Sequence, residues 1–355
     1  MRRLLGPVLC YSTGVAMAPT WTDAARVART LVPQLSHAAH KGQMGRIAVL
    51  GGSLEYTGAP YYAAAATLKV GADLAWVFTA AEAATPIKSY SPELIVIPVY
   101  EAARFASADA AAREAEVARF VEGVRAWLPR LHALVIGPGL GRDAAALEGA
   151  ARVVALARAR ALPIVIDADG LHLVTERPGV IAGYERAVLL PNEAEYARLR
   201  DAVLLPETAG AAPTPPAPPA AADAEAELKR VCAALGHVTV VRKGRVDLVS
   251  DGRQLLTCSE ATPPRRCGGL GDILAGACGV LVNWASRADA SLLPADGSGT
   301  PASPQLWAAW TACVLTKRSA KAAFAARRRS MTAPDVLDCV GPAFDEMFPL
   351  ELDDM

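Results

Sequence analysis

Short runs of apolar residues recur along the chain and alternate with longer amphipathic stretches. We expect the apolar runs to form buried strands at Arg46–Leu50, Leu74–Phe78, Leu94–Val99, Ala133–Gly137, Pro163–Asp167 and Ala187–Leu190. Stretches with helical spacing lie between them at Tyr61–Gly71, Ser107–Leu128 and Asp143–Arg160. Strands that lack a polar face and alternate with helices are typical of a parallel sheet covered on both sides. The pattern therefore predicts an α/β fold with a mostly parallel central sheet.

The pattern changes toward the C-terminal third of the chain. Three short apolar runs follow closely on one another at Val238–Arg242, Val246–Ser250 and Gln254–Cys258. Their spacing predicts a small antiparallel meander at one edge of the sheet. Further helices are expected at Trp21–Leu35, which Pro33 interrupts, and at Pro304–Arg328 and Thr332–Val340. Trp307 and Trp310 lie three residues apart in one of these helices and are expected to pack on the core.

Two segments interrupt the alternation of strands and helices. Leu204–Ala222 is rich in Pro and Ala, and Ser286–Ser303 consists mostly of small residues, so we expect exposed insertions, the first of them disordered. The remaining pattern predicts a single domain over residues 37–350, preceded by an extension over residues 1–36. The first twenty residues hold Arg2 and Arg3 and no acidic residue, which fits a weak mitochondrial presequence. The alternatives are a frayed N-terminus or an upstream start before Met17. We expect a cytoplasmic or mitochondrial protein.

Composition narrows the classes of partner. The 36 basic and 36 acidic residues of the 355-residue chain give a net charge of zero, which argues against nucleic acid or an anionic membrane as a partner. No apolar run approaches the roughly 20 residues that span a bilayer. The seven cysteines are scattered and form no CxxC motif, which indicates buried thiols rather than disulfides or a zinc site.

The stretch Arg265–Val280, RRCGGLGDILAGACGV, combines loop glycines, an acidic residue and an apolar helix. Backbone N–H groups in such a loop approach an anion closely, and the following helix adds the positive end of its dipole. Because Asp272 would repel a phosphate, binding alone does not need it. It fits a base that takes a proton from a hydroxyl attacking a phosphoryl group. The alternative is an ordinary glycine turn that Asp272 caps.

Other polar loops follow the presumed strands. They are the glycine-rich loop Gly51–Pro60, the GPGLGR loop Gly137–Arg142, the pair Asp167 and Asp169, the segment Pro191–Glu195, and Lys243–Gly244. Each has a simple structural explanation: Asn192 as the cap of a helix Glu193–Asp201, Asp169 as a turn former, Lys243 as a surface charge. Because such loops meet at the carboxyl edge of a parallel sheet, their joint occurrence predicts a site that handles phosphoryl groups.

The sequence resembles the ATP-dependent NAD(P)H-hydrate dehydratases of the ribokinase-like superfamily. The resemblance rests on motifs that run in order from about residue 41 to the C-terminal region: KGQMGRIAVLGGSLEYTGAPYYAA, KVGADL, SPELIV, IGPGLGRD, PIVIDADGL, LLPNEAEYARL, VVRKGRVDLVSDG, RRCGGLGDILAGACGVLVNW and TAPDVLDCVGPAF. The RRCGG and TAPDVL segments resemble the eukaryotic branch, which uses ATP rather than ADP. The fold this implies is the ribokinase-like α/β fold.

The resemblance implies a metabolite-repair reaction on the S epimer of hydrated NADH or NADPH (NADHX or NADPHX). ATP would phosphorylate the hydroxyl on C6 of the nicotinamide ring, and loss of phosphate would restore the ring double bond. Phosphate leaves far more readily than hydroxide, so a lyase driven by ATP needs only a kinase-type site. Mg²⁺ would accompany ATP.

The resemblance also implies a role for each matched position. Asp272 would be the base, and the N–H groups of Gly268–Gly271 would hold the transferring phosphoryl group, which makes Gly269 and Gly271 catalytic. The ATP site would include Lys243, Gly244, Arg245, Val246, Asp247, Thr262, Arg266, Cys267, Gly268, Gly269, Leu270 and Gly271. The hydrated dinucleotide would contact Gly139, Asn192, Glu193, Ala194, Glu195, Tyr196, Ala197, Arg198 and Asp272. Glu195 would also contact a water bound to Mg²⁺. Leu270 departs from the family, which often has a polar residue there.

Two other functions remain open at this stage. A small-molecule kinase of the same superfamily would share the GGLGD loop, although PNEAEYARL together with GPGLGR favours the dehydratase. A nucleotide-binding protein without activity would have no need of Asp272. The epimerase domain that often accompanies this family is absent, so we expect a separate NAD(P)H-hydrate epimerase to act alongside the chain. The resemblance is compatible with a homo-oligomer but fixes no number of subunits.

Overall fold

A single nine-stranded sheet organises the part of the chain that is described in the computed structural model, namely residues 21–107, 109–205, 221–295, 299 and 302–350. The strand order is β3-β2-β1-β4-β5-β6-β7-β8-β9. The strands are β1 (Arg46–Leu50), β2 (Leu74–Ala80), β3 (Ile95–Tyr100), β4 (Ala133–Ile136), β5 (Ile164–Ile166), β6 (Ala187–Leu189), β7 (Thr239–Arg242), β8 (Asp247–Ser250) and β9 (Leu255–Cys258). Strands β1 to β7 are parallel, and β7, β8 and β9 pair antiparallel.

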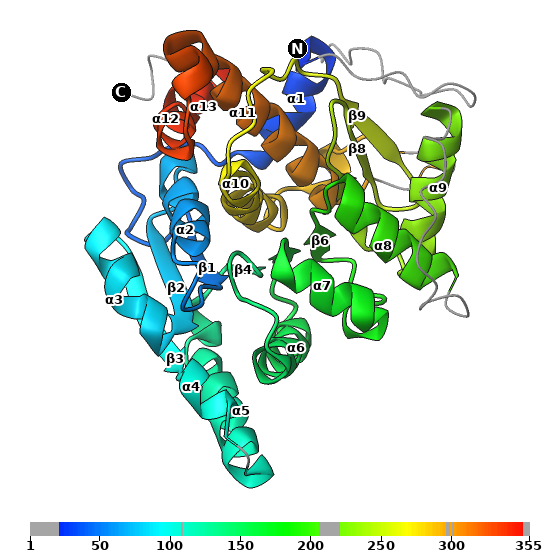
Figure 1. Ribbon diagram of the computed structural model, residues 1–355. Coiled ribbons are helices and arrows are strands. Elements are labelled where there is room, and N and C mark those ends of the chain that lie inside the picture. The colour runs from blue at the N-terminus through cyan, green and yellow to red at the C-terminus, as the bar shows by residue number, and fades with distance from the viewer. Residues whose placement is uncertain (1–20, 108, 206–220, 296–298, 300–301, 351–355) are drawn as a thin grey trace.

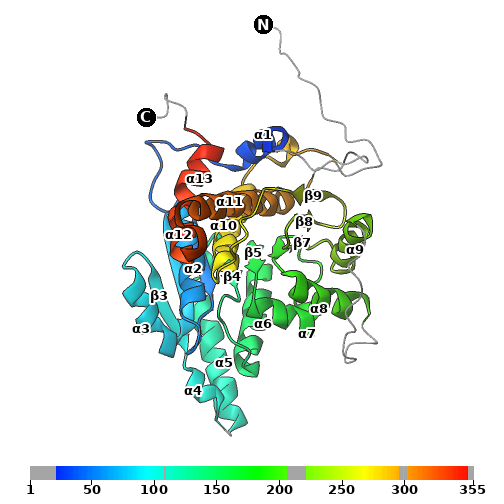
Figure 2. The same cartoon turned by 45° about the horizontal axis from the view of Figure 1, so that its top comes forward.

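Both faces of the sheet are buried. Along β1, Ile47 and Val49 belong to one hydrophobic core, while Ala48 and Leu50 belong to the other. This alternation follows from the two-residue period of a strand, which directs successive side chains to opposite faces. The apolar runs seen in the sequence are therefore strands that lie between two layers of helices (Figures 1 and 2).

The helices divide between the two faces of the sheet (Figure 2). The first core is covered by α1 (Trp21–Leu31), α2 (Gly58–Val70), α3 (Ala81–Tyr90), α10 (Leu270–Ala285), α11 (Pro304–Arg327), α12 (Ala333–Asp338) and α13 (Val340–Met347). The second is covered by α5 (Ala110–Arg125), α6 (Ala144–Ala159), α7 (Asp169–Glu176), α8 (Glu193–Leu204) and α9 (Ala221–Ala234), with the short α4 (Ala102–Phe105) beside α5. No helix of the described residues is long and apolar enough to cross a membrane.

Helix α10 lies close against its neighbours because its packing face carries glycines. A Cβ atom on Gly276 would lie 2.0 Å from the carbonyl oxygen of Ala63 in α2, and one on Gly279 would lie 2.8 Å from Val135 in β4. Neither distance leaves room for a methyl group. The small residues of the sequence motif thus let α10 rest on the sheet, with its N-terminus at the carboxyl ends of the strands.

The strand predictions are confirmed, with ends that differ by at most two residues, and the antiparallel edge is confirmed as well. Helices α3, α4, α7, α9 and α13 were not predicted. The helix expected at Thr332–Val340 is α12, which ends at Asp338, and α13 follows it from Val340. The predicted insertions are narrower than expected: α8 extends to Leu204 and α9 begins at Ala221, while residues 206–220, 296–298 and 300–301 lie outside the described residues.

The predicted N-terminal extension also needs correction. Residues 1–20 lie outside the described part of the chain, but α1 belongs to the folded domain. Ala24, Ala28 and Leu31 are buried in the first core. The ring of Trp21 stacks on that of Trp310, with 6.2 Å between the ring centroids, and meets the ring of Phe348 edge-on, with 5.6 Å between the centroids. The domain therefore begins by residue 21, and both ends of the described chain pack on α11 (Figure 1).

Candidate active site

The loops that follow β1, β4 and β5 meet at the carboxyl edge of the sheet. Their backbones touch: a Cβ atom on Gly137 would lie 1.9 Å from the carbonyl oxygen of Asp167, and Gly137 has φ of +118°. Only glycine fits such a position without strain. Asp169 also connects the loops after β4 and β5, since its carboxylate accepts a hydrogen bond of 2.9 Å from the N–H of Gly141. The prediction that these loops come together is confirmed.

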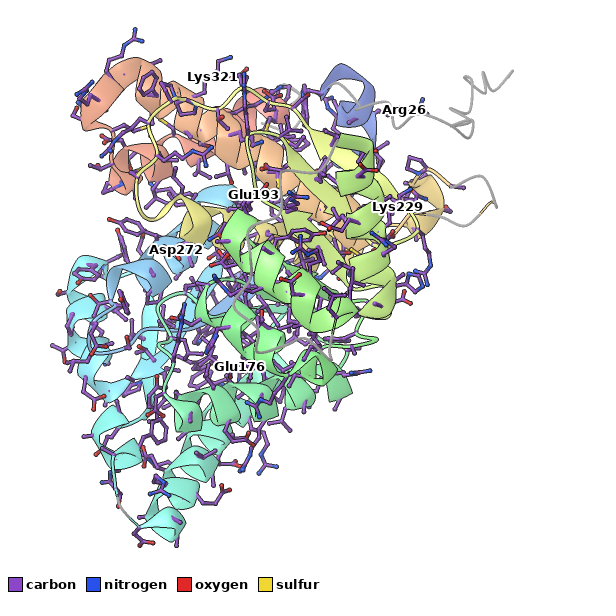
Figure 3. The ribbon with its side chains drawn as sticks, turned by 45° about the vertical axis from the view of Figure 1, so that its right-hand side comes forward. Arg26, Glu176, Glu193, Lys229, Asp272 and Lys321 are labelled. Atoms are coloured by element: carbon purple, nitrogen blue, oxygen red, sulfur yellow. The ribbon has the colours of Figure 1, made fainter. Side chains whose placement is uncertain are left out.

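A cavity of about 640 Å³ opens beside this edge. Its walls come from the start of α8, the β7–β8 turn, the glycine loop, and one face of α10 and α11. The lining residues are Asn192, Glu193, Ala194, Lys243, Gly244, Arg245, Asp247, Thr262, Pro263, Arg265, Arg266, Cys267, Leu270, Gly271, Leu274, Cys313, Thr316, Lys317 and Ala320. Figure 3 shows the two helix N-termini, with Glu193 at the start of α8 and Asp272 at the start of α10. A cavity of this size has room for a nucleotide.

The glycine loop ends at Gly269, which is the N-cap of α10 and has φ of +92°. Asp272 is the third residue of the helix, so the alternative in which it caps the turn is wrong. The N–H groups of the first helical turn have no acceptor within the helix. They face the site together with the positive end of the helix dipole, which is an arrangement that suits an anion.

Lys243, which lines the cavity, forms a largely buried ion pair with Asp167 behind it. The lysine Nζ lies 2.7 Å from Oδ1 of Asp167, and the carboxylate is 3% exposed. Burial alone would lower the pKa of Lys243, but the Asp167 carboxylate outweighs it and raises that pKa. The expectation of Lys243 as a surface charge is therefore wrong. A Cβ atom on Gly271 would lie 3.4 Å from Asp167 Oδ2 and 3.6 Å from Lys243 Nζ, so this pair adjoins the glycine loop.

Asp272 adjoins the same pair but is not among the residues that line the cavity. Burial, and then the negative charge of Asp167, raise its pKa from 3.8 to about 7, although Lys243 opposes the change. A carboxyl group with a pKa near neutrality is suited to act as a general base at physiological pH. Asp272 is thus poised for proton transfer beside the pair of Lys243 and Asp167, close to the nucleotide-sized cavity.

Backbone strain marks the segment that carries Asp167 and Asp169. Ala168, which lies between them, has φ of +49° and ψ of −120°. A residue with a Cβ atom adopts this conformation at a cost of about 1–3 kcal/mol. The strain lets one aspartate side chain pair with Lys243 while the other reaches the GPGLGR loop.

The segment Asn192–Glu195 forms a capping box at the start of α8. Asn192 Oδ1 accepts hydrogen bonds from the N–H groups of Ala194 and Glu195, and Glu195 Oε2 accepts one of 2.8 Å from the N–H of Asn192. Burial raises the pKa of Glu195, against the effect of that N–H group and of Lys243. Asn192 therefore is the helix cap that the sequence predicted, and it also lies beside the site, because it pairs with Lys243 in an isolated parallel bridge.

Most of the predicted nucleotide residues line the cavity. Those that do not are Val246, Gly268 and Gly269. Of the predicted dinucleotide contacts, Asn192, Glu193 and Ala194 line the cavity, whereas Gly139 lies against Tyr56 of the loop after β1. Tyr196 is 1% exposed and belongs to the second hydrophobic core, with the guanidinium of Arg242 over its ring at 4.7 Å. In this arrangement it supports α8 and does not face the cavity.

Sequence reasoning missed several residues at this site. Asp167 was placed near it, but its ion pair with Lys243 was not foreseen, because 76 residues separate the two. Leu274 and the α11 residues Cys313, Thr316, Lys317 and Ala320 were also missed. The signal for the α11 residues was their helical spacing, which places them on one face. The sequence alone does not show whether this face of α11 borders a cavity or packs in the core.

The described residues contain no group of three or more His, Cys, Asp or Glu side chains that could hold a metal ion. Cys267 lines the cavity, and burial raises the pKa of its thiol, so it does not have the character of a reactive thiolate.

Comparison with known proteins identifies the family. The family model described as NAD(P)H-hydrate dehydratase matches residues 47–341. The chain belongs to the NAD(P)H-hydrate dehydratase family. The match spans the sheet from β1 to β9 and continues through α10 and α11 into α13. It therefore includes every loop that contributes to the cavity.

Curated relatives in this family are similar over nearly their whole length. A bovine protein named ATP-dependent (S)-NAD(P)H-hydrate dehydratase is 48% identical over 324 residues, 91% of this chain and 88% of its own. The human protein of that name is 46% identical over 91% of this chain and 84% of its own. The protein of that name from Arabidopsis thaliana is 42% identical over 92% of this chain and 86% of its own.

Solved structures share the fold at low sequence identity. A Bacillus subtilis structure described as an ADP/ATP-dependent NAD(P)H-hydrate dehydratase co-crystallised with ATP/Mg²⁺ superposes with a TM-score of 0.63 at 17% identity. The match covers 94% of this chain and all of that one. A ribokinase-like superfamily protein from Enterococcus faecalis gives a TM-score of 0.65 at 19% identity, covering 90% of this chain and 94% of its own. The ribokinase-like fold is confirmed.

Proposed function

We propose that the protein dehydrates the S epimer of NADHX and NADPHX with ATP, and releases NAD(P)H, ADP and phosphate. Family membership and relatives of that name at 46–48% identity support the assignment. The structural observation that carries it is Asp272, a carboxyl group with a pKa of about 7 in the first turn of α10, next to the buried ammonium of Lys243. A base and a cation beside a helix N-terminus are what transfer of a phosphoryl group to a hydroxyl requires.

The chain's own residues divide the reaction between them. Asp272 accepts the proton of the C6 hydroxyl. At the same time the hydroxyl oxygen bonds to the γ-phosphorus of ATP, and the bond from that phosphorus to the β–γ bridging oxygen breaks to release ADP. Lys243 uses one N–H on Asp167 and has two more to direct at phosphate oxygens. The N–H groups of the glycine loop and of the first turn of α10 hold the transferring group. The C6–O bond then breaks to release phosphate, and water takes the proton from C5 as the ring double bond forms.

Mg²⁺ fits this site as a partner of the nucleotide rather than as a resident ion. Because no three-ligand cluster exists among the described residues, the protein would hold it through one or two carboxylates and the ATP phosphates. Glu195, whose carboxylate belongs to the capping box at the start of α8, would contact a water bound to this Mg²⁺. Mg²⁺ would neutralise phosphate charge when bound.

The dinucleotide would approach Asp272 from the side opposite the cavity. Gly139 contacts the loop that carries the exposed Tyr56, and neither residue lines the cavity. Asn192 lines the cavity and pairs with Lys243. A separate NAD(P)H-hydrate epimerase would act alongside this protein and convert the R epimer. We also propose that the protein forms a homo-oligomer.

A nucleotide-dependence assay tests the function. Purified protein with NADHX, Mg²⁺ and ATP should give a rise in the near-ultraviolet absorbance of the reduced nicotinamide, with one phosphate released per NADH formed. ADP in place of ATP should give little. A phosphorylated product that persists, without the absorbance rise, would instead support the small-molecule kinase.

Asp272→Asn tests the proposed base. The amide is nearly the same size but accepts no proton, so turnover should fall by about 10²–10⁴-fold while ATP still binds. Isothermal titration calorimetry with ATP measures the binding separately from turnover. Near-normal turnover in this variant would remove Asp272 from the mechanism.

A further inference from the structure

Helix α11 presents one face to the cavity through Cys313, Thr316, Lys317 and Ala320. Three of these residues are small or apolar, and the fourth is a lysine whose side chain is only 8% exposed. A lysine beside a nucleotide cavity is ordinarily expected to bind phosphate as a point charge. The contacts of Lys317 argue for a different role.

All three N–H donors of the Lys317 ammonium have protein acceptors. Its Nζ lies 2.9 Å from Asp247 Oδ2, 3.2 Å from the carbonyl oxygen of Arg245 and 3.2 Å from that of Cys258. An ammonium group has three donors and no acceptor, so none is left for a ligand. Lys243, by contrast, has one acceptor among the described residues, Asp167, and keeps two donors.

The acceptors of Lys317 hold the turn between β7 and β8. Asp247, at the start of β8, is 4% exposed, and its other oxygen accepts a hydrogen bond of 2.9 Å from the N–H of Gly244. Gly244 directly follows Lys243, the proposed phosphate ligand. The connection therefore runs from α11 through Lys317 and Asp247 to Gly244, and it fixes the backbone on which Lys243 stands.

We propose that Lys317 is a positioning residue: it binds no phosphate, and it sets the affinity for ATP by holding the turn Lys243–Asp247 against α11. The proposal rests on the proposed function only in that ATP is the ligand of the cavity. It predicts that loss of Lys317 weakens ATP binding and raises KM for ATP, while kcat changes less, because Asp272 and the glycine loop are untouched.

The test compares Lys317→Met with Arg318→Met. Arg318 is the next residue of α11, pairs with Glu260 at 2.9 Å, and does not line the cavity. Each substitution breaks one partly or fully buried ion pair between α11 and the antiparallel edge of the sheet, at Asp247 of β8 for Lys317 and at Glu260 after β9 for Arg318. We expect Lys317→Met to raise the Kd for ATP, measured by calorimetry, and KM for ATP by about tenfold, equivalent to 1.4 kcal/mol. Arg318→Met should leave both within about twofold.

A double variant separates positioning from charge balance. Lys317→Met leaves Asp247 as a buried charge without its cation, which destabilises the fold. Adding Asp247→Asn removes that charge and keeps an acceptor for Gly244. The double variant should therefore regain thermal stability but keep the weakened Kd for ATP. It also serves as the test if Lys317→Met alone fails to fold.

Two results would overturn the proposal: an unchanged Kd for ATP in Lys317→Met, or full recovery of Kd in the double variant together with stability. The first would mean that the turn holds its place without Lys317, and the second that Lys317 only balances charge. These outcomes differ from failure of the proposed function. In that case the unsubstituted protein would bind ATP without ATP-dependent dehydration, and calorimetry would still decide the role of Lys317.

Discussion

The raised pKa of Asp272 makes one substitution, Asp272→Asn, informative about both stability and catalysis. In the folded protein the carboxyl group has a pKa of about 7, against 3.8 for its ordinary value. The folded state therefore holds the proton over a range in which the unfolded state has lost it. The resulting stabilisation is fully present below about pH 3.8 and is lost as pH rises toward about 7. Wild-type protein should lose stability over this range, and the asparagine variant should lose less.

The size of the effect follows from the two pKa values. At 1.36 kcal/mol per pKa unit, ionised Asp272 costs the folded state about 4 kcal/mol at about pH 8 and under about 2 kcal/mol at about pH 5. The difference in unfolding free energy between Asp272→Asn and wild type should therefore shift by about 2.5 kcal/mol in favour of the variant between these two pH values. This is an upper value, because partial exposure of the side chain admits water.

Urea denaturation at the two pH values measures this shift. Asp345→Asn, a substitution of an exposed aspartate on α13, controls for the general effect of removing one negative charge. The same pKa predicts that kcat/KM of the wild-type enzyme falls about tenfold from about pH 8 to about pH 6. A stability difference that does not vary with pH, together with a flat rate profile, would refute the idea that burial and Asp167 make this carboxyl group a base near neutrality.

Two further pairs of substitutions test the packing and the strain that position the site. Gly276→Ala should cost about 3 kcal/mol of unfolding free energy, because its Cβ atom would lie 2.0 Å from the Ala63 oxygen. Gly341→Ala, whose Cβ atom would meet nothing closer than 3.8 Å, should change it by less than about 0.5 kcal/mol. Ala168→Gly and Arg328→Gly should each raise the free energy of unfolding by about 1 kcal/mol, because both residues have positive φ near 50°, where glycine is not strained. Only Ala168→Gly should lower kcat, since it loosens the segment between two aspartates; an equal kcat in both variants would contradict this.

The strands of the sheet could be predicted from the sequence because they are buried on both faces. Continuous apolar runs such as Ala133–Ile136 have little else to form, and all nine strands occur where they were expected. Helix α3 was not predicted because Pro86 lies inside it, and α7 was not predicted because it begins within the DADG turn. A proline and a turn signal usually end a helix, and here the surrounding packing overrides both.

The site was predicted where its chemistry lies in one contiguous motif. Asp272 and the glycines follow one another in sequence, so their proximity needed no knowledge of the fold. The ion pairs of Lys243 with Asp167 and of Lys317 with Asp247 join residues from distant strands and helices. No local pattern encodes such pairs, because a lysine in a loop and a lysine in a helix look alike until their neighbours are known.

The two lysines show why these pairs matter for the chemistry. Both are cations at the border of one cavity, and both have a buried aspartate as partner. Lys317 has all its donors engaged by the protein, whereas Lys243 has one engaged by Asp167, whose charge also raises the pKa of Asp272. Asp167 therefore acts on two groups at once: it holds the cation that would meet phosphate, and it keeps the base protonatable near neutral pH. Replacing it should disturb both, which is why a buried carboxylate that would touch neither ATP nor the dinucleotide belongs to the machinery of this site.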